Sequence, residues 1–272
     1  MAHNIAPDRL KKAARAVEWQ DLAPMKRHES LIECLHPVPW LSLALLCFHI
    51  SWWPVAIFAE FMFFLTALRV NHEAIHHNLG FGPRGHQTVL HALSLVMLGS
   101  NHSVAFNHLR HHRFINTVAD LEGKAGKMSL WRVILYGPMF PIECHIAAIR
   151  DGGWAWRRKV FADLAFNMVL PALAIATGLM FIAWHFLFML VAQCFTALFA
   201  VWITHRGCDE SQLVARSQGN GLVNAVSYNM FFHLEHHLFP GVPVKRLPKL
   251  AQRLDAALPE MRAQIKPVIG LY

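Results

Sequence analysis

Three short histidine clusters are the residues of this chain most suited to chemistry. They read HEAIHH (72–77), HLRHH (108–112) and HLEHH (233–237). Residues three and four apart share a helix face, so each cluster can direct two or three imidazoles at one point. His205 follows a long apolar block and belongs with them. A single histidine is usually a packing residue, but three such clusters in one chain indicate metal binding. The histidines interpreted as packing residues are His49, His145 and His185.

The number of histidines exceeds what one metal ion can bind. The clusters and His205 together hold 10 histidines. A tetrahedral zinc takes four ligands, whereas two six-coordinate ions can use about eight or nine and keep open positions. Imidazole binds Zn, Cu, Fe and Ni, so the spacing leaves the metal open. The pattern therefore predicts a site for two metal ions.

The composition indicates a membrane protein. Hydrophobic residues make up 55% of the chain and charged residues 15%, against roughly 25% charged in soluble domains. The net charge of +8 could suggest nucleic acid, but the basic residues follow a membrane topology, so we expect no nucleic-acid partner. The 5 cysteines are scattered, which argues against a disulfide framework or a thiolate zinc site.

Two long apolar blocks predict four membrane-spanning helices in two hairpins. Residues 38–70 are interrupted near Trp53, and residues 160–204 near Gly178. Each block is too long for one span of about 20 residues. We expect spans at about 38–53, 55–71, 160–178 and 183–204. Two shorter apolar stretches are expected to be buried or interface-lying helices: 88–98 and 130–149.

The charge distribution predicts which side of the membrane each segment occupies. Lys and Arg residues are absent from both outer turns, so the positive-inside rule puts both termini and the central segment in the cytoplasm. The even number of spans between the clusters then brings every histidine cluster to that face. We expect an all-α multi-pass membrane protein whose cytoplasmic helical cap holds the dimetal site. Residues 1–37 are expected to form a cytoplasmic segment and 38–272 one membrane domain.

Several polar residues near the clusters are weaker candidates. Glu73 and Glu235 could orient an imidazole by accepting a hydrogen bond, or could be solvated carboxylates. Asn229 could reach a metal, although a packing role is favoured. The acids after the second cluster are expected to pair with nearby cations: Asp120 and Glu122 with Arg113 or Lys124. Four histidines have no spacing that demands ligation: His77, His86, His91 and His102.

The histidine pattern resembles that of the membrane fatty-acid desaturase family, the histidine-box non-haem di-iron superfamily. The family's boxes are H-x(3,4)-H, H-x(2,3)-H-H and H/Q-x(2,3)-H-H, and HLEHHLFP from residue 233 is especially similar to acyl-lipid members. The resemblance covers about residues 38–250. It implies these metal ligands: His72, His76, His108, His111, His112, His205, His233, His236 and His237. It does not make His77 a ligand.

The resemblance also implies a reaction and its participants. The expected activity is O2-dependent oxidation of an unactivated C–H bond of an acyl chain, above all desaturation. Two Fe ions (Fe2+/Fe3+) would be the cofactor and O2 the co-substrate. Electrons are expected from a separate ferredoxin, rubredoxin or cytochrome, and a basic cytoplasmic face would suit an acidic carrier. Candidate residues for an apolar substrate tunnel are Phe63, Phe64, Phe106 and Phe232.

Two other functions remain as alternatives. A hydroxylase or carotenoid ketolase of the same superfamily begins with the same hydrogen abstraction. A membrane metal transporter would need polar ligands at mid-membrane depth, crossing between the two sides. The predicted spans hold few ionisable groups, all in or near them: His49, Glu60, Asp163 and His185. The clustering at one face favours an enzyme.

Overall fold

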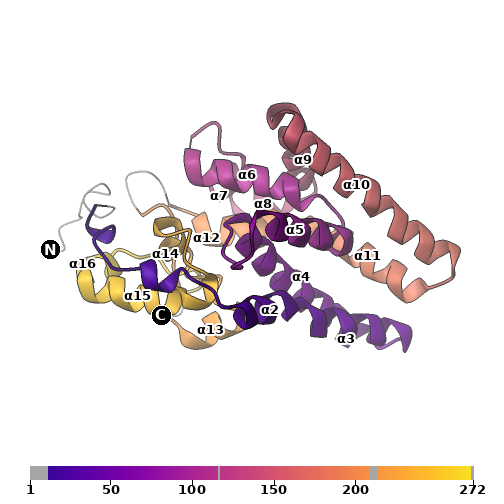
Figure 1. Ribbon diagram of the computed structural model, residues 1–272, viewed down its shortest axis with the longest axis horizontal. Coiled ribbons are helices and arrows are strands. Elements are labelled where there is room, and N and C mark those ends of the chain that lie inside the picture. The colour runs from indigo at the N-terminus through magenta and orange to yellow at the C-terminus, as the bar shows by residue number, and fades with distance from the viewer. Residues whose placement is uncertain (1–11, 116, 209–212, 271–272) are drawn as a thin grey trace.

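Helices form nearly all of the regular structure of this chain. The structure is a computed structural model that describes residues 12–115, 117–208 and 213–270. Within these ranges no extended strand occurs, and the one isolated bridge joins Ser217 to Pro267. The molecule is elongated, with long apolar helices at one end and short C-terminal helices at the other (Figure 1). The all-helical part of the predicted fold class is confirmed.

The first apolar block folds into two adjacent helices that pack on one another. Helix α2 (Arg27–Leu35) leads into α3 (Pro37–His49), and α4 (Trp53–Ile75) returns beside it. The turn between α3 and α4 contains Ser51 at φ +62°, a left-handed conformation that reverses the chain within a few residues. Proline opens both helices, where its missing N–H costs nothing. The predicted break in this block is where the structure turns.

The second apolar block also turns back on itself. Helix α10 (Gly153–Ala176) ends before Gly178, which has φ +72°, and α11 (Met180–Gln193) packs against α10. The chain continues as a π-helix, η2 (Ala197–Trp202), and ends in α12 (Ile203–His205). The axis bends by 44° between α11 and the segment that follows. The expected fourth span, 183–204, is therefore two helical pieces rather than one.

The number of possible membrane spans depends on how bent helices are counted. Three helices are long and apolar enough to cross a membrane: Arg27–His49, α4 and α10. The number rises to five if each of two bent pairs counts as one span. One such pair is α5 (Pro83–Met97) and α6 (Asn101–Phe114), which meet at 118°. Four spans, two membrane hairpins and a cytoplasmic orientation stay predictions.

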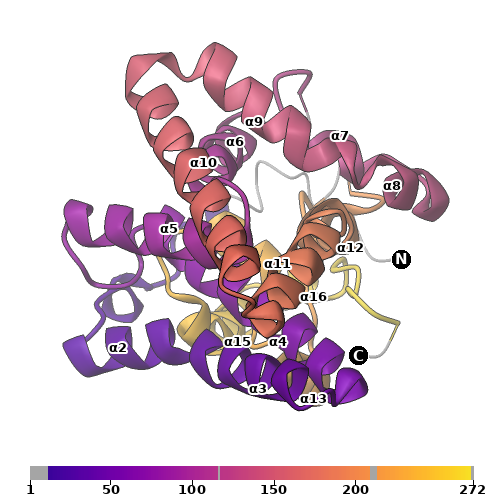
Figure 2. The same cartoon turned by 90° about the vertical axis from the view of Figure 1, so that its right-hand side faces the viewer.

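The central segment forms short helices beside the apolar bundle. Helices α7 (Leu121–Gly126), α8 (Leu130–Tyr136) and α9 (Met139–Asp151) follow α6, and α9 lies on the side of the bundle opposite α3 (Figure 2). The expected helix 130–149 is split at Gly137, where a Cβ would lie 1.9 Å from the carbonyl oxygen of Cys194. Only glycine allows that close approach.

The C-terminal helices form a cap with their own apolar core. Its elements are α13 (Gly221–Val226), α14 (His233–Leu238), η3 (Val244–Arg246), α15 (Leu247–Ala257) and α16 (Pro259–Arg262). Leu250 and Leu254 of α15 share this core with Ala14, Val17 and Leu22, which lie before or within η1 (Gln20–Leu22). The start of the described chain is thus packed on its end. The division at residues 37 and 38 stays a prediction.

Candidate metal centre

Four segments present histidines to one region at the junction of the apolar helices and the cap. The first cluster lies at the end of α4 and the second on α6. His205 ends α12, and α14 begins with His233. Residues three or four apart on each helix share a face, so each segment can contribute more than one imidazole.

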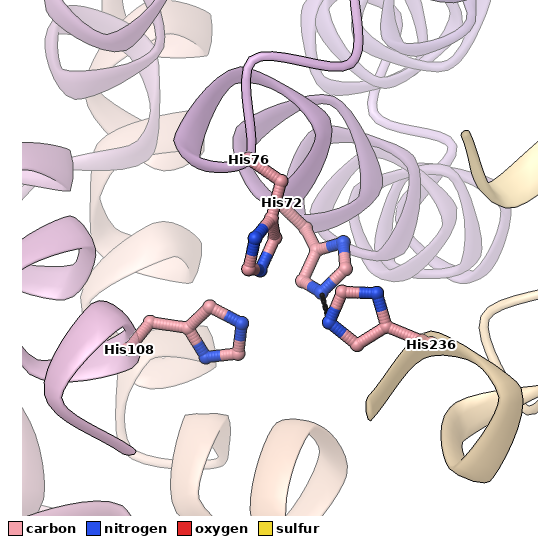
Figure 3. Close-up of side chains that lie close together, drawn as sticks. All are labelled: His72, His76, His108 and His236. Atoms are coloured by element: carbon pink, nitrogen blue, oxygen red, sulfur yellow. Dashed lines mark hydrogen bonds between the residues drawn. The ribbon is translucent and has the colours of Figure 1, made fainter. Parts of the chain in front are cut away.

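One group of imidazoles joins α4, α6 and α14. Ligand nitrogens of His72, His76, His108 and His236 all lie within 4.8 Å of one another (Figure 3). The Nε2 atoms of His72 and His236 are 2.9 Å apart. His112 belongs to this group as well, because its Nε2 lies 3.2 Å from that of His108 and 3.0 Å from that of His236.

A second group joins α6, α12 and α14. Ligand nitrogens of His111, His205 and His237 lie within 4.8 Å of one another. His233 completes the group, with its Nε2 at 2.9 Å from that of His205 and 3.2 Å from that of His237. The two groups adjoin, since the rings of His112 and His237 stack with centroids 4.4 Å apart. The structure thus brings together all nine histidines of the expected set.

The arrangement of nitrogens suits bound cations better than hydrogen bonds. The Nε2 atom of His205 faces three other Nε2 atoms at 3.2, 2.9 and 3.3 Å. One N–H can satisfy only one of these contacts, and a lone pair cannot bond to another lone pair. The buried Nε2 of His76 has no hydrogen-bond partner. A divalent cation in each group would satisfy these nitrogens.

Burial keeps the C-terminal imidazoles in the form that binds metals. Desolvation, followed by the neighbouring imidazoles, holds the pKa values of His233, His236 and His237 well below their ordinary range. A neutral imidazole keeps one lone pair, which is what a metal ion requires. The donor set therefore fits two divalent transition-metal ions.

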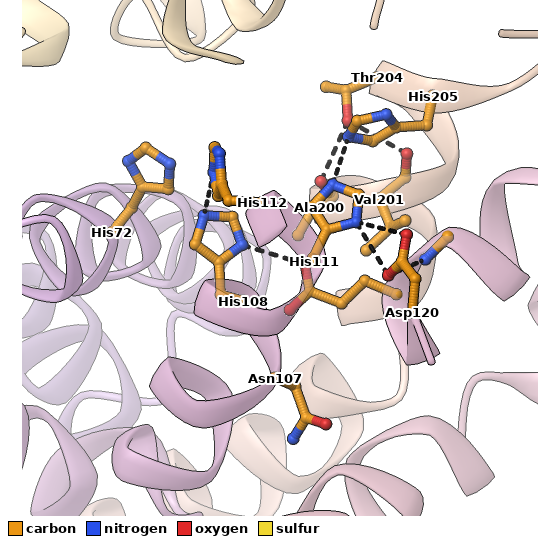
Figure 4. Close-up of polar contacts among 12 residues, drawn as sticks. His72, Asn107, His108, His111, His112, Asp120, Ala200, Val201, Thr204 and His205 are labelled. Atoms are coloured by element: carbon orange, nitrogen blue, oxygen red, sulfur yellow. Dashed lines mark hydrogen bonds and ion pairs between the residues drawn. The ribbon is translucent and has the colours of Figure 1, made fainter. Parts of the chain in front are cut away.

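Two buried carboxylates of one short segment support the histidines of α6. Nδ1 of His111 donates to Asp120, whose two oxygens both lie at 2.9 Å (Figure 4). Nδ1 of His108 donates to Glu122 at 3.0 Å. Asp120 also caps α7 by accepting the Gly123 amide at 2.8 Å. A proton held on Nδ1 leaves the Nε2 lone pair facing the centre.

The sequence predicted that Asp120 and Glu122 pair with Arg113 or Lys124. It did not predict that they support histidines. Lys124 pairs with Glu143 at 3.0 Å. Nothing in the local sequence distinguishes acids that support a ligand from acids on a solvated loop. A carboxylate within about ten residues of a histidine cluster was the only signal.

A family model described as fatty acid desaturase matches residues 50–268 of the chain. The match includes all three histidine clusters and His205. The chain belongs to the fatty acid desaturase family. No curated protein matches it. Membership makes the chain a membrane-associated oxidoreductase of a metalloenzyme type that acts on acyl chains.

The carboxylates inside the boxes of this desaturase-family chain accept hydrogen bonds from groups other than imidazoles. Glu73 accepts the amide of Val244 at 3.1 Å, and its nearest approach to Nδ1 of His72 is 3.8 Å. Glu235 accepts the hydroxyl of Ser217, and burial raises the pKa of Glu235 to about 7. These contacts fasten the first box to the backbone of Val244 and the third box to the side chain of Ser217.

The sequence left open whether His77 and Asn229 contact a metal, and the structure gives each of them other contacts. His77 adopts φ +59° and stacks on His86 with ring centroids 4.6 Å apart, so it lies outside both groups. Asn229 adopts φ +63° in the turn that precedes α14, where its backbone N–H donates to the backbone carbonyl of Asn224 at 2.8 Å. A contact between the Asn229 side chain and a metal stays a prediction.

A third polar cluster, of His91, His102 and Asp163, was not predicted as a group. Nδ1 of His91 and Nδ1 of His102 lie 2.5 and 2.8 Å from the two oxygens of Asp163. Ser100 donates to the same carboxylate at 2.6 Å. The only sequence signal was an aspartate inside an apolar block. The cluster ties α5 and α6 to α10.

The aromatic residues expected to line a substrate tunnel are all buried. They belong to three separate apolar cores. Phe63 and Phe64 pack with Met97 and Met189, whereas Phe106 and Phe232 each belong to another core. A common tunnel along these four side chains stays a prediction.

Proposed function

We propose that this chain is a membrane-bound di-iron enzyme that desaturates an acyl chain with O2. The convergence of nine imidazoles in two adjacent groups is the observation that carries this proposal. Eight or nine nitrogen ligands suit two metal ions with positions left open. Membership of the fatty acid desaturase family supports the acyl substrate and the oxidative reaction.

The contacts between imidazoles divide the proposed ligands between the two ions. One ion would bind His72, His76, His108, His112 and His236, and the other His111, His205, His233 and His237. Iron supports the reaction where zinc would not, because zinc has no redox chemistry. Bound iron would supply, with O2 and two electrons, the oxidant that a C–H bond without an acidic proton requires.

The side chains around the ligands do the remaining work. Asp120 and Glu122 hold Nδ1 protons, so the rings of His111 and His108 keep their orientation and donate electron density inward. Burial of His111 and His236 to 1% exposure excludes bulk water, which protects an oxidising centre from side reactions. The two carboxylates also place negative charge close to a ligand set that carries none.

The proposed reaction is tested with the full chain in membranes. Acyl lipids, acyl thioesters and free fatty acids are supplied with O2 and a reduced carrier, and the products are analysed by mass spectrometry. The expected result is a new double bond and two irons per chain. A product that is only hydroxylated or ketonised overturns desaturation and leaves the di-iron assignment. Absence of bound iron in active protein overturns both.

A hydroxylase or ketolase is the second candidate, because the same hydrogen abstraction begins all three reactions. Metal transport is the candidate from another class. It is disfavoured because two ionisable groups within the apolar helices pair with each other: Glu60 pairs with His185 at 2.8 Å, and His185 donates to the carbonyl of Val96 at 2.9 Å. Loosely exchanging metal at mid-membrane depth would favour transport over the enzyme.

The partners and orientation follow from the same proposal. A separate ferredoxin, rubredoxin or cytochrome would deliver electrons, and the site and both termini would face the cytoplasm. Mass spectrometry of lipids from cells that do and do not express the chain would identify the natural substrate and the position of attack.

A further inference from the structure

The proposed reaction requires electrons from outside the chain. Converting CH2–CH2 into CH=CH removes two electrons and two protons from the acyl chain. Reducing O2 to two water molecules consumes four of each. The missing two electrons and two protons must be delivered during every turnover, so the surface that receives a reduced carrier is part of the enzyme's function. The inference below rests on the proposed function.

A hollow between α6, α7 and α9 lies next to a carboxylate that supports the proposed metal centre. Its volume is about 510 Å³, and its wall includes Asn107, Arg110, Asp120, Lys127 and Arg150. Asp120 is the important member of this wall. It is 4% exposed and accepts the Nδ1 proton of His111, which places the hollow one side chain away from a proposed ligand.

The hollow opens onto the outer side of that ligand. Nδ1 of His111 points to Asp120, and Nε2 points in the other direction, to His205 at 3.2 Å (Figure 4). Bound ions would lie on the Nε2 side, so a C–H bond would have to approach from there. The hollow therefore does not suit the reacting part of the substrate. It does suit electron entry, which needs only a short connected path through the imidazole.

The wall of the hollow is basic. It holds four basic residues, Arg110, Lys124, Lys127 and Arg150, and two acids, Asp120 and Asp151, of which Asp120 is buried. The exposed pairs of this surface, Lys124 with Glu143 and Arg150 with Asp151, are of a kind that contributes little stability and exchanges readily for a new partner. An acidic protein surface would be attracted here.

The geometry points to this basic hollow as the docking site of a small electron-transfer protein with acidic residues around its redox group. The carrier covers the mouth formed by Lys127 and Arg150, and its electrons enter beside Asp120 and His111. An ion held by His111 and His205 would then lie nearest to the incoming electrons. Asp120 acts as a positioning residue for His111 and as the inner end of the docking site.

The test reverses charge at the mouth of the hollow. Lys127→Glu with Arg150→Glu is compared with Arg84→Glu with Lys249→Glu, an equal charge change at exposed residues of α5 and α15. The full iron-loaded chain is measured for affinity to an acidic [2Fe–2S] ferredoxin and to a soluble cytochrome b5 domain, each across a salt series. Iron per chain and product formed with dithionite are measured in parallel.

The expected result is a loss of about tenfold or more in carrier affinity for the first pair, because like charges would face one another. Its salt dependence should also weaken. The control pair should bind as wild type, and iron content and dithionite-driven product should stay unchanged in both. Equal losses in the two pairs, or no salt-dependent binding of either carrier by the wild type, overturn the docking site. Loss of iron or absence of any product in the wild type instead overturns the proposed function, while carrier affinity still reports on docking.

Discussion

Two histidine-containing clusters of this chain each bring three or more possible ligand atoms close together, and they differ in how their nitrogens are satisfied. In the nine-histidine centre, Nε2 atoms face other Nε2 atoms, and His76 has a buried nitrogen with no partner. In the cluster of His91, His102 and Asp163, both Nδ1 atoms face carboxylate oxygens, and Nε2 of His102 lies 3.1 Å from the side-chain oxygen of Gln87.

The difference shows that hydrogen-bond complementarity separates a metal centre from a structural network. Three ligand atoms within 4.8 Å occur in both places. Of the two clusters, only the nine-histidine centre directs several ring nitrogens at one another with too few N–H groups to pair them all. Burying such unpaired nitrogens costs free energy unless a cation is bound. The Asp163 cluster is complete without one. Its role is to hold α5, α6 and α10 together inside the apolar part of the molecule.

The largest effect is expected from removing a proposed ligand. His236→Ala should abolish turnover and lower the iron content, because it removes a ligand that contacts both His72 and His112. His111→Ala should do the same in the second group. Product analysis and iron per chain measure the change, with His28→Ala, an exposed histidine, as the control. Full iron and activity in His236→Ala would show that the ligand assignment is wrong.

A smaller loss is expected from removing a carboxylate that supports a ligand. Asp120→Asn should weaken iron affinity by about 10–100-fold, because an amide accepts the His111 Nδ1 proton less strongly than a carboxylate does. The rate of iron transfer to a chelator measures this, and the exposed Asp151→Asn is the matched control. If Asp120→Asn released iron no faster than the control, its contact with His111 would have no role in holding metal.

A substitution in the Asp163 cluster should lower the stability of the fold and leave the metal content unchanged. Asp163→Asn should destabilise the fold by about 1–3 kcal/mol, because the N–H groups of His91 and His102 lose a charged acceptor. Thermal unfolding in detergent measures the loss, and iron per chain should stay at the wild-type value. Loss of a bound metal from this variant would make the cluster a third metal site and remove the contrast.

The smallest effect is expected at a histidine outside both clusters. His145→Ala should leave iron content and turnover close to wild type. Its ring joins Ser100 to Pro141 by hydrogen bonds of 2.9 and 2.6 Å, so stability should fall by about 1 kcal/mol. The same two assays, with unfolding in detergent, test this. A marked loss of iron would extend the centre to α9.

Much of the centre was predictable because helix geometry is local. The i, i+4 pair of each later box falls in one group: His108 and His112 in the first, His233 and His237 in the second. The remaining members, His111 and His236, fall in the opposite groups. The spacing predicts which imidazoles share a face. It does not predict which group each face meets, because that depends on how α4, α6, α12 and α14 pack.

The sequence by itself determined that the chain is helical and apolar and carries histidines at metal-binding spacing, since composition and short-range periodicity are properties of neighbouring residues. Only the tertiary structure decided that the nine histidines form two groups, that Asp120 and Glu122 support them, and that a basic hollow lies behind His111. It also split two expected helices, at Gly137 and after α11. These features depend on contacts between residues distant in the chain, which no local pattern encodes.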